Sequence, residues 1–183
     1  MTAKKIITHC APTLAGLKTA NLFNEPFTDK DELLDEINSF NEMFSEYGIK
    51  MIPLSFDNNV ALIYVYRIKD LQNDFGNVLS QELLTKYGYE SNDIVNSINR
   101  LGNRINAHKD FPHEIGLFLG YPPEDVKGFI DNKAQNYKCV GYWKVYGDEQ
   151  KAIECFRKYR RCQQIFLSHL ELGFSLKQLV IQK

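Results

Sequence analysis

The amino-acid sequence predicts an α+β fold, in which a small, mainly antiparallel sheet is surrounded by several helices. Apolar residues recur at every second position in some segments, which is typical of strands. In other segments they recur at three- and four-residue steps, which is typical of helices. Several helices around a small antiparallel sheet indicate the α+β class. The 183 residues, 44% of them hydrophobic, suffice for a single domain over 1–183 with a core of its own.

Several segments are expected to be helical. A short helix over 11–23 would have Pro12 in its first turn, where the missing N–H costs nothing. Thr28 is a suitable N-cap for a second helix, which would end at Gly48. Further helices are expected over 71–88, 91–105, 114–130 and 148–172, with a short one from Ser175.

Two regions are expected to supply the strands. Ile49–Phe56 and Val60–Arg67 are rich in β-branched and aromatic residues, and Asp57-Asn58-Asn59 between them tolerates left-handed conformations. This pattern predicts a hairpin over 49–67. A third strand is expected over 137–146, where both alternating sets contain large apolar groups, so we expect it to be central in the sheet.

The charge of the chain is −1 overall and unevenly distributed. Residues 1–132 contain 12 basic and 19 acidic residues, whereas 133–183 contain 10 and 4. The near-neutral total excludes a global attraction to nucleic acid or anionic membranes. The basic C-terminal part suits an anion, an acidic partner or the chain's own acidic part.

The cysteine content and hydropathy indicate a cytoplasmic protein. Four cysteines are too few for a disulfide framework in a chain of this length. No run approaches the roughly 18 apolar residues that a membrane span needs. Charged and proline residues interrupt any signal-peptide core near the N-terminus. We therefore expect no membrane partner.

One constellation has the residue types of a Cys-dependent enzyme. Cys10, next to His9, precedes an expected helix start, where backbone amides favour a thiolate. His113 would act as a distant base and Glu114 would orient it. The alternative is that Cys10 is a small buried hydrophobic residue beside a surface histidine. These residues and Cys139 are also ligand types for zinc or iron, but they lack the spacing of structural zinc sites, so no metal is expected.

A small-molecule site is the interpretation that we favour, with a planar or anionic ligand. The aromatic residues of the expected strand could line a pocket or stack on a flat molecule, although a core strand also needs such residues. They are Tyr137, Tyr142, Trp143 and Tyr146. Two arginines one helical turn apart could bind a phosphate or carboxylate, although they also suit a solvated helix face. No dinucleotide or phosphate-loop fingerprint indicates a cofactor. The candidate binding residues are His9, Tyr121, Cys139, Tyr142, Trp143, Arg157 and Arg161.

A third interpretation is a protein-interaction or regulatory module. The segment 114–130 has the spacing of a helical hairpin, with Gly116 where the two helices would cross and Gly120 in the turn. Its second helix begins with Glu124 and Asp125, which would repel phosphate, so nucleic acid is not expected as a partner. The hairpin and the basic helix 148–172 are the candidate interaction surfaces, and the sequence identifies no partner protein.

Three segments together, His9–Lys18, Phe111–Pro122 and Tyr137–Tyr146, resemble a known family. They are similar to the uncharacterised bacterial family of unknown function DUF3793, in the same order and over essentially the whole chain. This resemblance implies no activity, cofactor or catalytic residue. Each segment places a Cys, His or aromatic residue beside Gly or Pro, which fixes the backbone or permits close approach. We therefore expect the segments around Cys10, His113 and Cys139–Trp143 to meet at one pocket.

Overall fold

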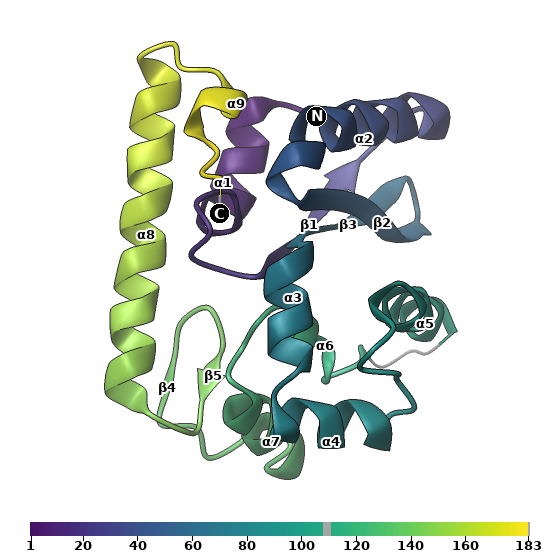
Figure 1. Ribbon diagram of the computed structural model, residues 1–183, viewed down its shortest axis with the longest axis vertical. Helices are drawn as coiled ribbons and strands as arrows, with labels where there is room; N and C mark the ends of the chain where they lie inside the picture. The colour runs from purple at the N-terminus through teal and green to yellow at the C-terminus, as the bar shows by residue number, and fades with distance from the viewer. Residues whose placement is uncertain (108–110, 183) are drawn as a thin grey trace. The chain divides into compact units, whose positions relative to one another are not determined.

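The computed structural model describes residues 1–107 and 111–182, which form helices and small antiparallel sheets (Figure 1). This combination confirms the α+β class. The chain divides into two compact units: unit 1 comprises Met1–Lys69 and Tyr159–Lys183, and unit 2 comprises Asp70–Lys158. That the whole chain acts as a single domain stays a prediction. Among the described residues, every helix is too short or too polar to span a membrane.

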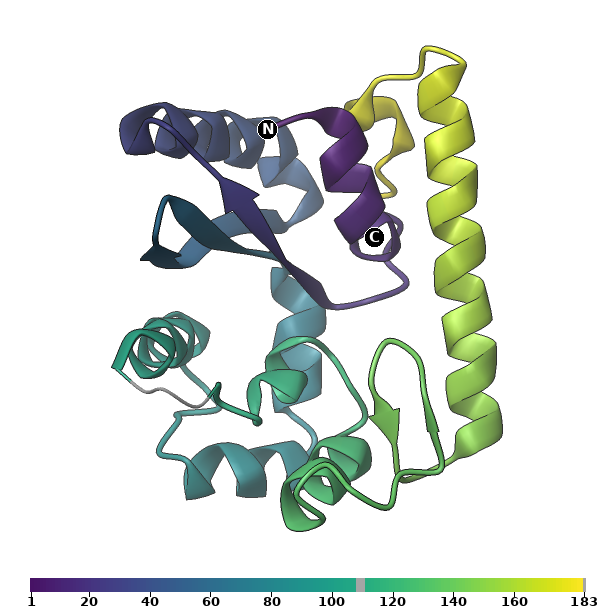
Figure 2. The same cartoon turned by 180° about the vertical axis from the view of Figure 1, so that it is seen from behind.

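Unit 1 contains a three-stranded antiparallel sheet in the order β1-β3-β2 (Figure 2). Strands β2 (Ile49–Asp57) and β3 (Val60–Arg67) form the expected hairpin. Asn58 and Asn59 in its turn have φ values of 47° and 61°, the left-handed conformation that these residue types tolerate. The third strand is β1 (Ala20–Pro26), which pairs with β3 along its whole length.

The start of unit 1 corrects the prediction of a helix over 11–23. Helix α1 (Ala3–Leu14) begins and ends earlier, and Gly16 at φ 70° leads the chain away from it toward β1. Pro12 lies in the last turn of α1 rather than the first, so it offers no N–H to the carbonyl one turn earlier, that of Thr8. That carbonyl instead accepts a hydrogen bond of 2.6 Å from Gln163 Nε2. A side chain of unit 1 therefore replaces the hydrogen bond that Pro12 cannot donate to the carbonyl of Thr8.

The core of unit 1 lies between its sheet and its helices. Helix α2 (Lys30–Phe44) begins after Asp29, whose side chain accepts hydrogen bonds from the first backbone amides, so the cap lies one residue after Thr28. The buried residues of α2 are Leu33, Ile37, Phe40 and Phe44, which recur at three- and four-residue steps and so share one helix face. Helix α8 (Glu149–Glu171) contributes Cys162 and Phe166, and α9 (Leu176–Leu179) contributes Leu179.

Unit 2 is mainly helical. The helix expected over 71–88 is interrupted, because the Asn77 side chain accepts hydrogen bonds from the amides of Leu79 and Ser80 and starts a new helix. The expected helical hairpin over 114–130 is present, with Gly120 at φ 69° between its two helices. The helices are α3 (Ile68–Phe75), α4 (Val78–Lys86), α5 (Ile94–Ala107), α6 (Ile115–Phe118), α7 (Pro123–Asp131) and the first part of α8.

The segment 137–146 forms a short hairpin rather than one central strand, which corrects the second strand prediction. Strand β4 (Cys139–Val140) pairs antiparallel with β5 (Lys144–Val145), and the amide of Gly141 donates to the carbonyl of Trp143 in the turn. In the described chain these strands form a separate two-stranded sheet. A Cβ at Gly141 would lie 2.3 Å from the ring of Phe156, so only glycine permits this close approach.

Candidate functional site

A pocket of about 190 Å³ lies in unit 2 between the α6–α7 hairpin and the β4–β5 hairpin. The structure thus brings together two of the three segments that were expected to meet, and the rings of Tyr121 and Trp143 are 4.9 Å apart. The convergence of the Cys10 segment with them stays a prediction. The side chains that give the pocket its chemistry are Phe111, His113, Tyr121, Phe129, Trp143 and Lys144.

The buried carboxylate of Asp125 connects the two hairpins. Its Oδ2 accepts a hydrogen bond of 2.7 Å from Trp143 Nε1, and its Oδ1 accepts bonds of 2.7 Å from the amides of Tyr146 and Gly147. Three donors therefore satisfy a carboxylate that is only 3% exposed. Asp125 fixes the plane of the indole at the pocket wall, which is a role that the sequence did not predict.

The hairpin α6–α7 is tight because of a glycine at its crossing point. A Cβ on Gly116 would lie 2.7 Å from a methyl carbon of Val126 and 3.2 Å from the ring of Tyr121. Both distances are shorter than ordinary van der Waals contact, so the expected crossing at Gly116 is confirmed. The same close approach places the Tyr121 ring beside the pocket.

The described lining of the pocket combines aromatic walls with a firmly held cation. Lys144 Nζ donates a 2.9 Å hydrogen bond to the carbonyl of Ala134 and lies over the rings of Tyr137 and Phe129, at 4.7 and 5.7 Å from their centroids. The exposed ring of His113 packs edge-on against Phe129 at 5.0 Å. Burial raises the pKa of Tyr121 to about 12, so its hydroxyl stays neutral.

Glu114 belongs to a different cluster in unit 2. Its carboxylate is 2% exposed, accepts a 2.8 Å hydrogen bond from the Tyr89 hydroxyl and forms an ion pair of 2.9 Å with Arg104 Nε. Burial, and then the hydrogen bond to Glu114, raises the pKa of Tyr89 well above its usual value. Because its charge is already engaged, Glu114 is better suited to stabilising the unit than to orienting the neighbouring His113.

Cys10 lies inside α1 and not in front of a helix, which corrects the premise of the nucleophile hypothesis. Since α1 begins at Ala3, the helix N-terminus that would favour a thiolate is remote from Cys10. Burial raises the pKa of Cys10 to about 12, and the charge of Lys18 offsets this only in part. The geometry favours the alternative, a small buried hydrophobic residue. A catalytic role for Cys10, His113 and Glu114 stays a prediction.

His9, the neighbour of Cys10, is exposed and stacks on Phe23, with centroids 5.0 Å apart and planes 9° from parallel. Burial is the largest cause of a lowered pKa at His9, and the charge of Lys5 adds to it. The ring is therefore mainly neutral near pH 7 and packs on β1.

Cys10 is expected to resist alkylation in the folded protein. Because the thiolate is the attacking species, reaction of Cys10 with iodoacetamide near pH 8 should be at least about a hundredfold slower than that of an unburied thiol. Half-buried Cys139 and Cys155 should react first. Timed labelling with peptide mass spectrometry measures the order, and labelling in urea is the control that should equalise the rates. Labelling of Cys10 ahead of Cys155 would contradict this and favour the nucleophile hypothesis.

The other expected binding residues are only partly drawn together. Tyr142 packs against Phe156, with ring centroids 5.7 Å apart. Burial is the largest cause of a raised pKa at half-buried Cys139, and the charge of Glu149 adds to it. Arg157 and Arg161 are exposed on α8, and their role as anion ligands stays a prediction. Over residues 1–107 and 111–182, no group of three His, Cys, Asp or Glu side chains is placed to hold a metal ion.

Sequence reasoning missed Asp125, Phe129 and Lys144. A signal for Asp125 was present, because it precedes Phe129 by four residues and so shares a helix face with it. An acidic residue on the inner face of a helix indicates a buried partner. Lys144 had no comparable signal, since its place at the pocket depends on the β4–β5 turn.

The family of the chain is shown by comparison with family models. The model described as "Protein of unknown function (DUF3793)" matches residues 6–180, which include both segments that line the pocket. No curated protein and no solved structure matches the chain.

Proposed function

Because the chain belongs to the DUF3793 family, whose description assigns no activity, we propose a function from the geometry of unit 2: binding of a small planar anion. The observation that carries this proposal is a pocket with aromatic side chains around it and the Lys144 ammonium at its edge. The free state of all four cysteines agrees with a cytoplasmic location, which forms part of the proposal.

The size and walls of the pocket support a ligand with one ring. A volume of about 190 Å³ is smaller than the roughly 300 Å³ at which pockets for drug-sized molecules begin. The walls include Tyr121, Phe129 and Trp143, and aromatic rings favour offset-stacked or edge-on contacts with another flat group. A monocyclic aromatic molecule fits both features.

The charges at the pocket support a negatively charged ligand. An ammonium has three N–H donors, and Lys144 uses one for the carbonyl of Ala134, which leaves donors for a carboxylate. Among the described residues that line the pocket, Asp125 is the only one with a carboxylate, and its oxygens already accept three hydrogen bonds. A ligand carboxylate would therefore meet a cation and little uncompensated negative charge.

Three one-ring probes test this proposal: benzoate, neutral benzyl alcohol and the cation phenyltrimethylammonium. Trp143 is the only tryptophan in the chain, so its fluorescence reports occupancy directly. Benzoate is expected to change the fluorescence saturably and to bind about tenfold more tightly than benzyl alcohol, because only benzoate forms a charge-assisted hydrogen bond with Lys144.

Substitutions separate the charge from the shape of the pocket. Lys144→Met keeps much of the aliphatic stem and should weaken benzoate binding about tenfold, with benzyl alcohol unchanged. Lys151→Met, at an exposed lysine in the same unit, is the matched control and should leave both affinities unchanged. Tightest binding of phenyltrimethylammonium, or no saturable change with benzoate, would contradict the proposal.

A further inference from the structure

Unit 1 has an open groove of its own, which the proposed function does not use. The groove has a volume of about 940 Å³ and is lined by residues of α1, α2 and α9. Buried Ile6 and Phe40 lie at its base, and Met43, which is 46% exposed, forms part of its wall. An exposed apolar side chain next to an apolar base indicates a surface on which another group can pack.

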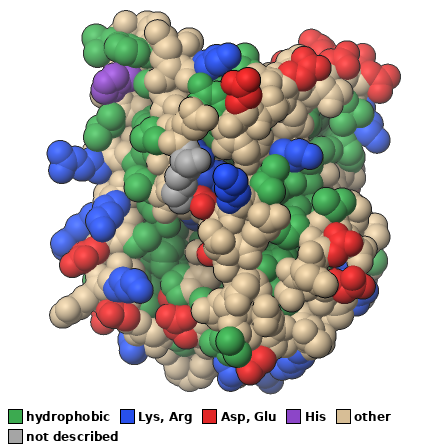
Figure 3. Space-filling view, viewed as in Figure 1, with side chains coloured by type: hydrophobic (Ala, Val, Ile, Leu, Met, Phe, Trp, Pro, Cys, Tyr) green, Lys and Arg blue, Asp and Glu red, His purple; other side chains and the backbone are tan. Residues whose placement is uncertain are grey.

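The lining of the groove changes character along α2. The N-cap and first turns contribute only acidic residues to it, whereas the following turns contribute Ser39, Phe40, Met43 and Phe44. One end of the groove is therefore acidic and the other is apolar. Figure 3 shows the acidic side chains gathered over α2 at the upper right. The acidic residues of the lining are Asp29, Asp31, Glu32, Asp35 and Glu36.

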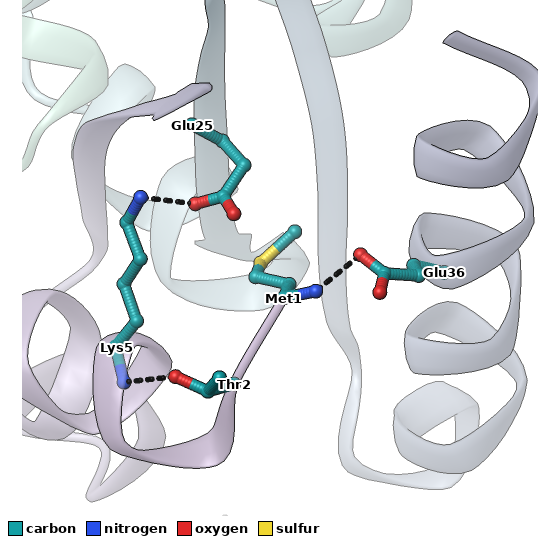
Figure 4. A network of polar contacts seen from close by, with 5 residues as sticks. All are labelled: Met1, Thr2, Lys5, Glu25 and Glu36. Carbon is teal, nitrogen blue, oxygen red and sulfur yellow. Dashed lines mark hydrogen bonds and ion pairs between the residues drawn. The ribbon is translucent and has the colours of Figure 1, made fainter. Parts of the chain in front are cut away.

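Most of this negative charge is not neutralised within the described residues. The amino group of Met1 pairs with Glu36, and nearby Lys5 pairs with Glu25 instead of an acid of the groove (Figure 4). Asp31, Glu32 and Asp35 are exposed and form no ion pair in the part of the chain that the structure describes. Lys177 is the cation that α9 adds to the lining. The excess of acidic residues leaves a negative field at one end of the groove.

We propose that this groove binds a short segment of a partner protein, with apolar side chains at one end and Lys or Arg at the other. The apolar side chains would pack on Phe40 and Met43, and the basic ones would lie along Glu32 and Asp35. A nucleic acid or an anionic membrane does not fit, because the acidic end repels phosphate. The 15 residues of α2 extend about 22 Å, which is the length of roughly seven residues of an extended segment.

Synthetic peptides of about 12 residues, which are longer than the roughly seven extended residues that span α2, test this proposal. The first peptide has leucines in one half and lysines in the other, and carries fluorescein for anisotropy measurements. A second has the same composition with leucines and lysines evenly mixed, and a third has glutamates in place of the lysines. The segregated peptide is expected to bind at least about tenfold more tightly than the mixed one, and the acidic one should not bind.

Variants of α2 locate the binding. The double variant Glu32→Lys with Asp35→Lys should weaken the binding of the segregated peptide at least about tenfold, because two attractive charges become repulsive. Met43→Ser should weaken the binding of this peptide several-fold, because apolar contact is lost. Glu42→Lys reverses an exposed charge of the same helix outside the groove and should change the affinity less than about twofold. Circular dichroism should show each variant to be folded.

Three results would overturn the proposal. Equal binding of the segregated and mixed peptides would indicate unspecific charge attraction, as would equal effects of Glu42→Lys and the double variant. Self-association that the double variant abolishes, measured by sedimentation velocity, would make a second copy of the chain the occupant. Because the groove and the benzoate pocket belong to different units and have different readouts, either proposal can fail while the other holds.

Discussion

Replacing Arg67 by methionine is expected to destabilise unit 1 by about 3 kcal/mol. Arg67 is 3% exposed at the end of β3, and its Nε donates to the carbonyl of Thr13 at 2.6 Å. Its Nη2 donates at 2.7 Å to the carbonyls of Leu14 and Ile181. The guanidinium thus joins the C-terminal end of α1, where the helix dipole is negative, to the C-terminal segment of the chain.

The size of the effect follows from what methionine can replace. Methionine retains apolar packing but has no donor, so three charge-assisted hydrogen bonds are lost. The carbonyls of Thr13 and Leu14 keep a backbone partner each, which limits the loss. Arg67→Lys should recover only part of the stability, because one ammonium does not reproduce the planar, forked geometry of a guanidinium.

Urea unfolding followed by far-UV circular dichroism measures this effect. Lys69→Met, at an exposed cation two residues later, is the control and should change the free energy of unfolding by less than about 0.5 kcal/mol. A change for Arg67→Met no larger than that of the control would contradict the expected role. Trp143 lies in unit 2, so coincident shifts of its fluorescence and of the dichroism would also support the single-domain prediction.

Elements specified by local sequence were predicted well. The hairpin 49–67 follows from alternation and from the Asn58-Asn59 turn, both of which lie within a few residues of each other. The last long helix follows from Asp148, whose carboxylate accepts from the amide of Lys151, and from Gly173 at φ 89°. In these cases the residues that specify an element are part of it.

Elements that depend on distant partners were predicted poorly. Strand β1 exists because it pairs with β3, about 40 residues further along the chain, and its own sequence alternates weakly. The β4–β5 hairpin turns through Tyr142 and Trp143, which are large residues rather than typical turn formers. Its turn depends on packing against Phe156 and on Asp125, neither of which is adjacent in the sequence.

The candidate site shows the same division. Residue type drew attention to His113, Tyr121 and Trp143, which line one pocket, and their roles there stay predictions. The Cys10 hypothesis depended on a helix that begins after Cys10, but α1 begins at Ala3, and burial raises the pKa of Cys10 instead of lowering it. Helix boundaries are thus the weakest basis for an electrostatic prediction.

Replacing Asp125 by alanine is expected to have the largest effect in unit 2, a loss of about 3 to 5 kcal/mol. The substitution removes the acceptor of three hydrogen bonds and leaves the indole N–H of Trp143 and the amides of Tyr146 and Gly147 without it. Asp125→Asn keeps the shape of the side chain and one acceptor oxygen. Its NH₂ group, however, would face at least one of these N–H donors, because both oxygens of Asp125 accept hydrogen bonds. We expect Asp125→Asn to lose about 2 kcal/mol.

The fluorescence of Trp143 connects this stability change to the pocket. Urea unfolding followed by this signal gives the free energy, and benzoate titration of the folded Asp125→Asn variant gives the affinity, which should fall because the indole is no longer held. Glu124→Gln, at the exposed acid beside Asp125 on α7, is the matched control and should leave both quantities within error of the parent protein. An Asp125→Asn variant with unchanged stability and unchanged benzoate affinity would show that the two hairpins are held together without this carboxylate.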